Sequence, residues 1–415
     1  MSRAIKQFLL FLGIYILTKF AICLENGLAR TPPMGWLSWE RFKCNINCRH
    51  DPHNCISENL FMEMANRLVE DGYRDAGYKY VNIDDCWMAK YRNVHGDMVP
   101  DPERFRRGIK FLSNYMHVRE LKLGIYQSFG TKTCMGFPGS VGHMEQDAKK
   151  FAEWEVDMVK FDGCYTPPSQ MKKGYVKMGT FLNRTGRPMV YSCSWPYYEL
   201  LKNMEPNYKL ISTYCNMWRN FHDIQDSWHS ITETINFFGD NQAVITNFTG
   251  PGRWSDPDML MIGNLHLNVG QARVQMAAWA IFPAPLLMSN DLRFIKPEFR
   301  NILLNRDVIA INQDALGIPG KRMYKDNGVD IWVRKITPVI EADTSFAILF
   351  INMRKNNKKA TVSFSLLELG LKEDKNYLIT EIFRHKSYGL RSNKTVEVIV
   401  PANDCVMLSC MVLKY

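Results

Sequence analysis

Short apolar runs alternate with longer amphipathic stretches between residue 31 and about residue 315. Each run ends in polar or aromatic residues, and most runs are separated by enough chain for a crossover helix. Between them, apolar residues recur at helical spacing, as in residues 58–71 after the N-cap candidate Ser57 and in residues 143–154. The runs that predict strands span residues 79–83, 121–126, 156–161, 188–192, 209–214 and 285–288. This alternation predicts βα units with parallel strands.

Carboxylates and aromatic side chains follow these runs all along the chain and are not concentrated at one phosphate-binding turn. A doubly wound sheet and a barrel both satisfy βα alternation. In a (β/α)8 barrel, however, every strand presents its C-terminal end at one rim, so residues far apart in sequence meet in one pocket. We therefore predict an α/β fold of the (β/α)8 TIM-barrel type.

The pattern changes after residues 317–320 to short alternating runs, which predict strands. These runs span residues 329–333, 346–351, 360–366, 377–383, 396–400 and 406–413. They predict a C-terminal antiparallel β-sandwich, and the scarcity of convergent carboxylates indicates an accessory role. We expect a catalytic barrel over residues 24–317 and a C-terminal antiparallel β domain over residues 318–415.

The first 23 residues have the pattern of a signal peptide. Arg3 and Lys6 precede an apolar run over residues 8–17, and the small residues Ala21 and Cys23 suit a cleavage site. The run is too short for a membrane span and is followed by Lys19. No later segment approaches about 18 unbroken apolar residues. We expect a secretory-pathway protein, lysosomal or secreted, without stable membrane insertion after cleavage.

The cysteines and sequons agree with that compartment. Of eleven cysteines, Cys23 lies in the predicted leader, which leaves an even number able to form disulfides. A zinc site is the alternative, but Cys44, Cys48 and Cys55 have no second C-x-x-C or nearby His pair. The sequence predicts N-glycosylation at Asn183, Asn247 and Asn393.

Charge and motifs narrow the classes of function. The 52 Lys and Arg residues exceed the 42 Asp and Glu residues, but they are scattered and lack the aromatic-basic interleaving of RNA-binding proteins. A solvated basic surface without a nucleic-acid partner accounts for them. The G-x-S-x-G elbow, the G-x-G-x-x-G turn and the Walker loop are missing, so serine hydrolases and nucleotide enzymes are disfavoured.

A Lys-Phe-Asp-Gly-Cys segment at residues 160–164 ends one of the apolar runs. Residues two apart on a strand share a face, so Lys160 and Asp162 are expected in the pocket, with Phe161 packed outward. A nearby ammonium favours the ionised carboxylate that a nucleophile requires. An ordinary strand-end salt bridge is the alternative.

A second candidate carboxyl group lies in the segment over residues 218–223, which follows another predicted strand. Asp223 lies beside Arg219 and aromatic residues, and from spacing alone Asp226 is an equal candidate or either residue is a helix cap. Glycoside hydrolysis uses two carboxyl groups, and the retaining route needs them about 5 Å apart in different protonation states. Two carboxyl groups at one rim would meet the need of glycoside hydrolysis, with Asp223 as the candidate proton donor.

Further acidic residues suit the binding of sugar hydroxyls. Asp84 and Asp85 end another run, and no D-x-D-x-D-G loop or H-E-x-x-H helix accompanies them to indicate a metal. Asp256 and Asp258 end a further segment, where Asp258 is the candidate sugar ligand and Asp256 braces a loop. Trp39 and Trp87 are candidate platforms for a pyranose face, and the core is the alternative location for each.

These segments together resemble the family 27 glycoside hydrolases, a group of α-galactosidases and α-N-acetylgalactosaminidases. The resemblance covers about residues 24–317 and rests on Met34-Gly35-Trp36-Leu37, Ile83 to Trp87, Lys160 to Cys164 and Asp256-Pro257-Asp258. It implies a (β/α)8 barrel with a C-terminal β domain, a homodimer, and double displacement with retention and no cofactor or metal. It also implies that Asp162 is the nucleophile and that Asp223, in place of Asp226, is the acid/base.

The resemblance extends to ligands and disulfides. It implies sugar contacts from Trp39, Asp84, Asp85, Tyr126, Lys160, Arg219 and Asp258, with Asp84 and Asp85 at the 4- and 6-hydroxyls. It implies the disulfides Cys44–Cys86, Cys48–Cys55, Cys134–Cys164 and Cys193–Cys215. Cys405 and Cys410 have no counterpart in that pattern.

The choice of sugar depends on the segment over residues 193–198. The α-galactosidases of the family carry Glu and Leu where this chain has Ser194 and Tyr197, and the α-N-acetylgalactosaminidases carry Ser and Ala. Ser194 resembles the second group, whereas Tyr197 departs from both, and its phenol fills the acetyl space unless the loop shifts or the ring swings out. A further departure is Gln127-Ser128, where the family has a small residue and then Asp.

The resulting hypothesis is hydrolysis of terminal α-linked N-acetylgalactosamine, galactose or both from glycolipids, glycoproteins and oligosaccharides. One alternative is a strict α-galactosidase. Another is a weakly catalytic, lectin-like relative that keeps the sugar pocket. A metal-dependent hydrolase requires histidines at strand ends, and His222 is the nearest candidate.

Overall fold

The computed structural model describes residues 26–354, 356–372, 374–391 and 395–414. The expected signal peptide and the sequon asparagine Asn393 lie outside these ranges. None of the helices in the described part of the chain has the length and apolar character that crossing a bilayer requires.

Eight parallel strands form the first sheet, in the order β7-β6-β5-β4-β3-β2-β1-β8. The strands are β1 Met34–Leu37, β2 Tyr80–Asn82, β3 Lys122–Ser128, β4 Met158–Asp162, β5 Val190–Cys193, β6 Met217–Arg219, β7 Trp254–Asp256 and β8 Leu286–Met288. Leu260, just after β7, closes the barrel: its amide donates to Leu287 at 2.8 Å, and its carbonyl accepts from Ser289 at 3.0 Å. The predicted α/β barrel is confirmed.

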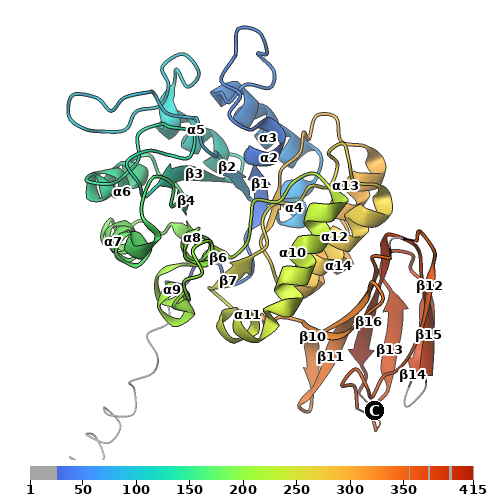
Figure 1. Ribbon diagram of the computed structural model, residues 1–415. Helices are drawn as coiled ribbons and strands as arrows, with labels where there is room; N and C mark the ends of the chain where they lie inside the picture. The colour runs from blue at the N-terminus through green and yellow to red at the C-terminus, as the bar shows by residue number, and fades with distance from the viewer. Residues whose placement is uncertain (1–25, 355, 373, 392–394, 415) are drawn as a thin grey trace, which may run out of the picture.

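Helices surround the strands (Figure 1). Their bounds are α2 Trp39–Phe42, α3 Glu58–Glu70, α4 Tyr73–Ala76, α5 Gly108–His117, α6 Met144–Glu153, η1 Pro168–Gln170, α7 Met171–Arg184, α8 Trp195–Leu200, α9 Tyr208–Tyr214, α10 Trp228–Asp240, α11 Gln242–Phe248, α12 Val269–Ile281, α13 Pro297–Leu303 and α14 Arg306–Asn312. The two amphipathic helices expected from apolar spacing are α3 and α6. Ser57 caps α3 by accepting from the Leu60 amide.

The strand predicted over residues 209–214 is wrong, because this segment lies in α9. Asn207 accepts from the amide of Leu210 and starts the helix, and Ile211 is buried on its inner face. Leu210, Ile211 and Tyr214 follow helical spacing as well as they fit an apolar run. The strand at this point of the barrel is β6, which begins three residues later.

The C-terminal domain is an antiparallel sandwich, as predicted. A six-stranded sheet has the order β14-β13-β16-β11-β10-β9, and β12 pairs with β15 in a second sheet. The strands are β9 Lys321–Asp326, β10 Val329–Ile340, β11 Asp343–Asn352, β12 Ala360–Ser365, β13 Tyr377–Glu381, β14 Ser387–Arg391, β15 Thr395–Val400 and β16 Asp404–Val412. The rings of Phe350 and Phe364 meet between the two sheets at 4.7 Å. Alternating inward residues thus form a second core.

The two domains meet along α12 (Figure 1). Arg273 on α12 binds Asp404 on β16 through two hydrogen bonds of 3.0 and 2.6 Å. The buried Arg334 of β10 donates to the carbonyls of Ala280 and Ile311 near the ends of α12 and α14. Charge-assisted bonds therefore fix the sandwich against the barrel.

Four disulfides join the same pairs that the family resemblance implies: Cys44–Cys86, Cys48–Cys55, Cys134–Cys164 and Cys193–Cys215. Cys405 and Cys410 are unpaired and buried on β16. Three of the four bridges adjoin strand ends that carry candidate site residues, since Cys86 follows Asp84 and Asp85 after β2, Cys164 follows β4 and Cys193 ends β5.

Candidate active site

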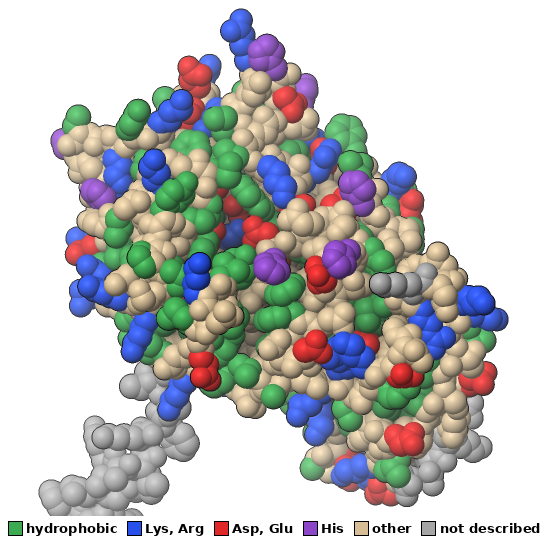
Figure 2. Space-filling model, viewed as in Figure 1, with side chains coloured by type: hydrophobic (Ala, Val, Ile, Leu, Met, Phe, Trp, Pro, Cys, Tyr) green, Lys and Arg blue, Asp and Glu red, His purple; other side chains and the backbone are tan. Residues whose placement is uncertain are grey.

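The candidate residues lie at the C-terminal ends of the barrel strands. Acidic and basic side chains lie in a hollow of this face in Figure 2. The strands and the loops that follow them contribute Trp39 after β1, Asp84 and Asp85 after β2, Tyr126 on β3, Lys160 and Asp162 on β4, Ser194 and Tyr197 after β5, Arg219 on β6, Asp223 in the next loop and Asp258 after β7.

The carboxylate of Asp162 is held by hydrogen bonds on both oxygens. Its Oδ1 accepts from the Tyr198 phenol at 2.6 Å and from the Gly163 amide at 2.9 Å. Its Oδ2 accepts from the Tyr126 phenol at 3.0 Å. Phe161 packs outward in contact with Tyr175, as the strand alternation predicts. Donors from three segments thus fix the orientation of this carboxyl group.

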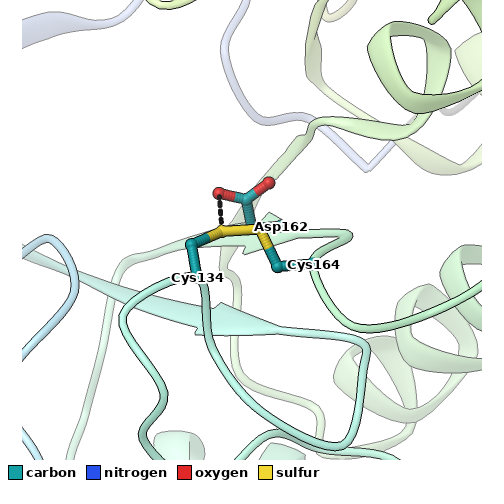
Figure 3. Close-up of side chains that lie close together, drawn as sticks. All are labelled: Cys134, Asp162 and Cys164. Atoms are coloured by element: carbon teal, nitrogen blue, oxygen red, sulfur yellow. Dashed lines mark hydrogen bonds between the residues drawn. A yellow bond between two sulfur atoms is a disulfide. The ribbon is translucent and has the colours of Figure 1, made fainter.

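The Cys134–Cys164 disulfide lies against this carboxylate (Figure 3). Sγ of Cys134 is 3.4 Å from Oδ2 of Asp162. These three side chains have the spacing of a metal cluster, but sulfurs bonded to each other are not thiolate ligands. The bridge is therefore a packing support for Asp162.

Lys160 and Asp84 form a buried ion pair beside Asp162. Nζ of Lys160 donates to Oδ2 of Asp84 at 2.6 Å. Burial works against the ammonium, yet the surrounding aspartates, Asp84 first, raise the pKa of Lys160. Burial raises the pKa of Asp84 despite the lysine, and it raises the pKa of Asp85 to about 6. The site thus contains buried acceptors whose charge is balanced by Lys160.

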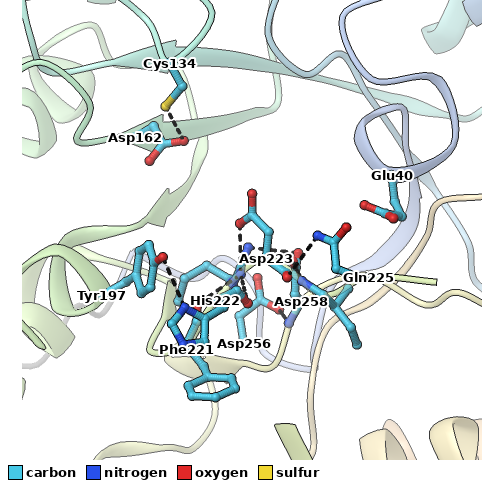
Figure 4. Close-up of polar contacts among 12 residues, drawn as sticks. Glu40, Cys134, Asp162, Tyr197, Phe221, His222, Asp223, Gln225, Asp256 and Asp258 are labelled. Carbon is cyan, nitrogen blue, oxygen red and sulfur yellow. Dashed lines mark hydrogen bonds and ion pairs between the residues drawn. The ribbon is translucent and has the colours of Figure 1, made fainter. Parts of the chain in front are cut away.

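Arg219 organises the loop that carries Asp223. Its Nη2 donates to the carbonyls of Phe221 at 3.1 Å and His222 at 2.7 Å, and to Oδ1 of Asp223 at 3.2 Å. Partial removal from water favours the neutral form of Asp223, but the charges of Arg219 and Lys160 hold the pKa of this carboxyl below its ordinary value. In Figure 4 the Asp223 carboxylate points into the space that Asp162 faces from the opposite side.

Asp258 and Asp256 lie on the other side of Arg219. Nη1 of Arg219 donates to Oδ1 of Asp258 at 2.9 Å, and Oδ2 of Asp258 accepts from the Ile224 amide. Asp256 accepts from the Asp258 amide at 2.8 Å, which is the bracing contact expected for it. Burial, followed by the negative charge of Asp258, raises the pKa of Asp256 to about 7 against the effect of Arg219.

The geometry separates Asp223 from Asp226. Oδ2 of Asp226 accepts from the amides of Leu265 and His266 at 2.9 and 3.2 Å, and lies 2.9 Å from Nδ1 of His266. Asp226 therefore anchors the loop after β7. Asp223 has a half-exposed carboxylate in the hollow.

The two tryptophans suggested as sugar platforms differ in environment. Trp87 is fully buried, packs edge-on against Trp154 and donates to the Tyr126 carbonyl, so the expectation of a platform there is wrong. Trp39 is only partly buried, and the Lys43 ammonium lies 5.6 Å from its ring. Gln127 and Ser128 are buried, and the Ser128 amide donates to Gln127 at 2.7 Å. The Gln127 amide group contacts Met98 Sδ at 3.5 Å, and the Ser128 hydroxyl donates to the Cys164 carbonyl at 3.5 Å.

Ser194 and Tyr197 lie at the start of α8. Ser194 is buried, and its amide donates to the Phe161 carbonyl at 3.1 Å. The Tyr197 ring is partly exposed and lies edge-on to His222, with its hydroxyl 3.4 Å from His222 Nδ1. The phenol thus contacts the loop that carries Asp223. In this conformation the ring leans toward the end of β6.

Sequence reasoning missed two features of the site. Tyr198 entered only as part of the 193–198 segment, although it donates the shortest hydrogen bond to Asp162. Glu40 was not considered, yet it accepts from the Asp226 amide at 3.3 Å, and burial raises its pKa. For Glu40 the available indication was a carboxyl group soon after the strand at residues 34–37, whereas the sequence holds no such indication for Tyr198.

Two carboxylates facing one hollow at the rim of a parallel barrel, with buried hydroxyl acceptors around them, define a glycoside hydrolase site. The family model described as alpha galactosidase A matches residues 31–314, and the model described as alpha galactosidase C-terminal beta sandwich domain matches residues 326–410. The chain belongs to this family, the family 27 glycoside hydrolases, and is an enzyme of that class.

Individual relatives agree. The chain is 50% identical to an alpha-N-acetylgalactosaminidase of Gallus gallus, over 92% of this chain and 94% of that protein. It is 49% identical to alpha-galactosidase A of Homo sapiens, over 84% of this chain and 80% of that protein. The crystal structure of alpha-galactosidase I from Mortierella vinacea superposes with a TM-score of 0.81 at 28% identity, covering 93% of this chain and 98% of that one.

Proposed function

We propose that this protein is a retaining exo-α-glycosidase that releases terminal α-linked N-acetylgalactosamine, and galactose to a lesser extent, from glycolipids, glycoproteins and oligosaccharides. The observation that carries this proposal is the pair of carboxylates: Asp162, fixed by Tyr126 and Tyr198, faces Asp223 on the loop held by Arg219. The family relationship supports the same reading.

In the first step, Asp162 attacks the anomeric carbon while Asp223 gives its proton to the glycosidic oxygen. The bond from the anomeric carbon to that oxygen breaks, and a bond to an Asp162 oxygen forms. The leaving group departs as an alcohol that carries the proton. The phenols of Tyr126 and Tyr198 orient the attacking carboxylate by hydrogen bonds and do not protonate it.

In the second step, Asp223 is the base. It takes a proton from water, whose oxygen attacks the anomeric carbon and displaces Asp162. The Arg219 guanidinium beside Asp223 stabilises the carboxylate that each first step leaves behind. Two inversions give net retention.

The glycone is held by groups around these two residues. Asp84 and Asp85 are the acceptors for the 4- and 6-hydroxyls, and both are almost fully buried. Lys160, Arg219 and Asp258 complete the polar surface, and the exposed part of Trp39 offers an apolar face. Buried acceptors of this kind reject sugars that leave them unpaired.

Ser194 supports the preference for the N-acetylated sugar, and Tyr197 limits it. Ser194 is too small to occupy the space beside the 2-position, and Tyr197 leans toward His222. We expect Tyr197→Ala to raise kcat/KM for the α-N-acetylgalactosaminide relative to the α-galactoside, because the ring still narrows the acetyl space.

The test is hydrolysis of the p-nitrophenyl α-N-acetylgalactosaminide and α-galactoside between about pH 4 and 7, with Asp162→Asn alongside. The proposal predicts turnover of both sugars, a preference for the first, and a loss of several orders of magnitude in the variant. A strict preference for galactose supports the α-galactosidase alternative. Binding without turnover supports the lectin-like alternative.

We also propose delivery through the secretory pathway to lysosomes or the cell exterior. The four disulfides support an oxidising compartment, and Asn183 and Asn247 of the predicted sequons are exposed. Endoglycosidase treatment that leaves the mass of the secreted protein unchanged would contradict the glycosylation.

The assembly and domain division follow as proposals. We propose a homodimer, on the family resemblance, to be checked by analytical ultracentrifugation. We place the division between a barrel over residues 24–317 and a β domain over residues 318–415, where α14 ends and β9 begins. Limited proteolysis near residue 317 tests the boundary.

A further inference from the structure

Tyr197 and His222 form a contact between two loops at the edge of the hollow. Tyr197 lies in the first turn of α8, and His222 precedes Asp223 in the loop after β6. The tyrosine hydroxyl lies 3.4 Å from Nδ1 of His222, and the two rings meet edge-on at 5.8 Å. Tyr197 is partly exposed and His222 is exposed, so both keep surface free for a ligand. Figure 4 shows the pair beside Asp223.

The pair lies on the leaving-group side of the reaction. Asp162 attacks the anomeric carbon from one face, so the group that Asp223 protonates must depart on the other face. His222 is the neighbour of Asp223 in the chain. Tyr197 contacts His222 directly, and its phenol pKa is raised by burial first and then by the negative charges of Asp223 and Asp162. The first residue beyond the scissile bond therefore passes these two rings.

The His222 side of the pair is rigidly supported. The imidazole packs at 4.4 Å on Phe221, whose ring stacks at 4.5 Å on Phe237 of α10. Arg219 also holds the carbonyls of Phe221 and His222 by hydrogen bonds. A surface that is already ordered loses little entropy when a ligand binds.

On these grounds, and given the proposed function, we propose that Tyr197 and His222 form an aglycone subsite that binds a pyranose, the second sugar of an oligosaccharide chain. The apolar ring of Tyr197 packs against the carbon-bound hydrogens of that sugar, and the imidazole exchanges hydrogen bonds with its hydroxyls. The subsite favours substrates whose leaving group is a sugar over those without an aglycone.

The test compares two substrates with the same glycone. α-N-acetylgalactosaminyl fluoride has no aglycone, whereas the α-1,3-linked disaccharide of N-acetylgalactosamine and galactose has a sugar there. The corresponding galactosides serve if galactose is the better glycone. Failure of the wild type on both pairs rejects the proposed function and leaves this subsite without a basis, whereas turnover of the fluoride establishes the function independently.

For His222→Ala we expect kcat/KM on the disaccharide to fall about tenfold, and on the fluoride to change less than about twofold. Tyr197→Phe keeps the ring and removes the hydroxyl, and its effect in combination with His222→Ala should be less than additive. The control is His229→Ala, whose side chain is 81% exposed on α10 and pairs with Glu233. The control should leave both substrates unchanged.

Three outcomes overturn the proposed pyranose subsite. An equal loss on the fluoride and the disaccharide means that His222 acts through Asp223. No loss on either substrate means that the aglycone passes elsewhere. If a glycopeptide with N-acetylgalactosamine on serine is affected and the disaccharide is not, the aglycone is peptide and the pyranose proposal is wrong.

Discussion

The Tyr198 phenol donates a 2.6 Å hydrogen bond to Oδ1 of Asp162, from a helix that begins after the neighbouring strand. Burial and the Asp162 charge raise the pKa of this phenol, so it remains a donor over the whole working range of pH. The proposed nucleophile is thus oriented by a hydroxyl that keeps its own proton and donates it in a hydrogen bond.

Replacing Tyr198 by Phe should therefore impair catalysis more than folding. We expect kcat/KM to fall about 10- to 100-fold, because a charge-assisted hydrogen bond to the attacking carboxylate is lost. Thermal unfolding should change little, since the ring remains. Tyr165→Phe is the matched control, because Tyr165 is 59% exposed in the same region. Equal activities of the two variants would show that Tyr198 does not position Asp162.

The activity should be greatest at acid pH. Asp223 must carry a proton to protonate an unactivated leaving group, and Arg219 and Lys160 hold the pKa of Asp223 low. kcat/KM on the disaccharide should decline as pH rises from about 4 toward 7. A dinitrophenyl glycoside, which leaves without a proton, should lack this decline. A disaccharide profile that rises toward pH 7 would contradict the role of Asp223.

Stability should also be greater in acid. Burial raises the pKa of Asp256 to about 7 and that of Asp85 to about 6, above the ordinary value of 3.8. The folded state therefore binds more protons than the unfolded state between about pH 4 and 7, so stability is full below about pH 4 and is lost as pH rises through that window. The combined change is on the order of a few kcal/mol.

The variant Asp256→Asn isolates the contribution of Asp256 to the pH dependence of stability. An amide oxygen can still accept from the Asp258 amide, but the side chain no longer titrates. The unfolding temperature measured by calorimetry should fall less between pH 4.5 and pH 7.5 in the variant than in the wild type. An unchanged difference between the two pH values would show that Asp256 is not buried in its neutral form.

The disulfide beside Asp162 should matter for both stability and turnover. Cys134 and Cys164 are 30 residues apart, and replacing both with Ser should cost about 3–4 kcal/mol of unfolding free energy by loop entropy. kcat should also fall, because the bridge packs against the carboxylate. Cys48 and Cys55 are 7 residues apart and form the control, with a cost of about 2–3 kcal/mol and no change in kcat.

Equal kcat values for the two disulfide variants would contradict the support of Asp162 by the bridge. Chemical denaturation of each oxidised variant measures its unfolding free energy, and burst kinetics with an aryl glycoside measures its kcat.

The sequence predicted the barrel and the sandwich because strand ends and periodicity are local signals. It failed at residues 209–214, where Leu210, Ile211 and Tyr214 fit a strand and a helix equally, and the Asn207 cap decided for the helix. It also left Asp223 and Asp226 open. Their difference depends on Leu265 and His266, about forty residues away, which take the Asp226 carboxylate out of the hollow.

Contacts between segments that are distant in the sequence could not be predicted either. Nothing in the spacing of Tyr198 indicates that its hydroxyl meets Asp162 across 36 residues. The burial of Trp87 could not be predicted for the same reason, because its contact with Trp154 depends on how α6 packs on the barrel. Pairing of the cysteines likewise came from family resemblance, since several pairings are compatible with the sequence alone.

The most direct test of the account is the stereochemistry of azide rescue. Asp162→Ala and Asp223→Ala are incubated with a dinitrophenyl α-glycoside and sodium azide, and the glycosyl azide is identified by NMR. Without its nucleophile, Asp162→Ala should give the inverted β-azide. Asp223→Ala still forms the glycosyl-enzyme, so azide should displace it to give the retained α-azide. The opposite assignment of the two products, or wild-type hydrolysis by either variant, would contradict the roles of Asp162 and Asp223.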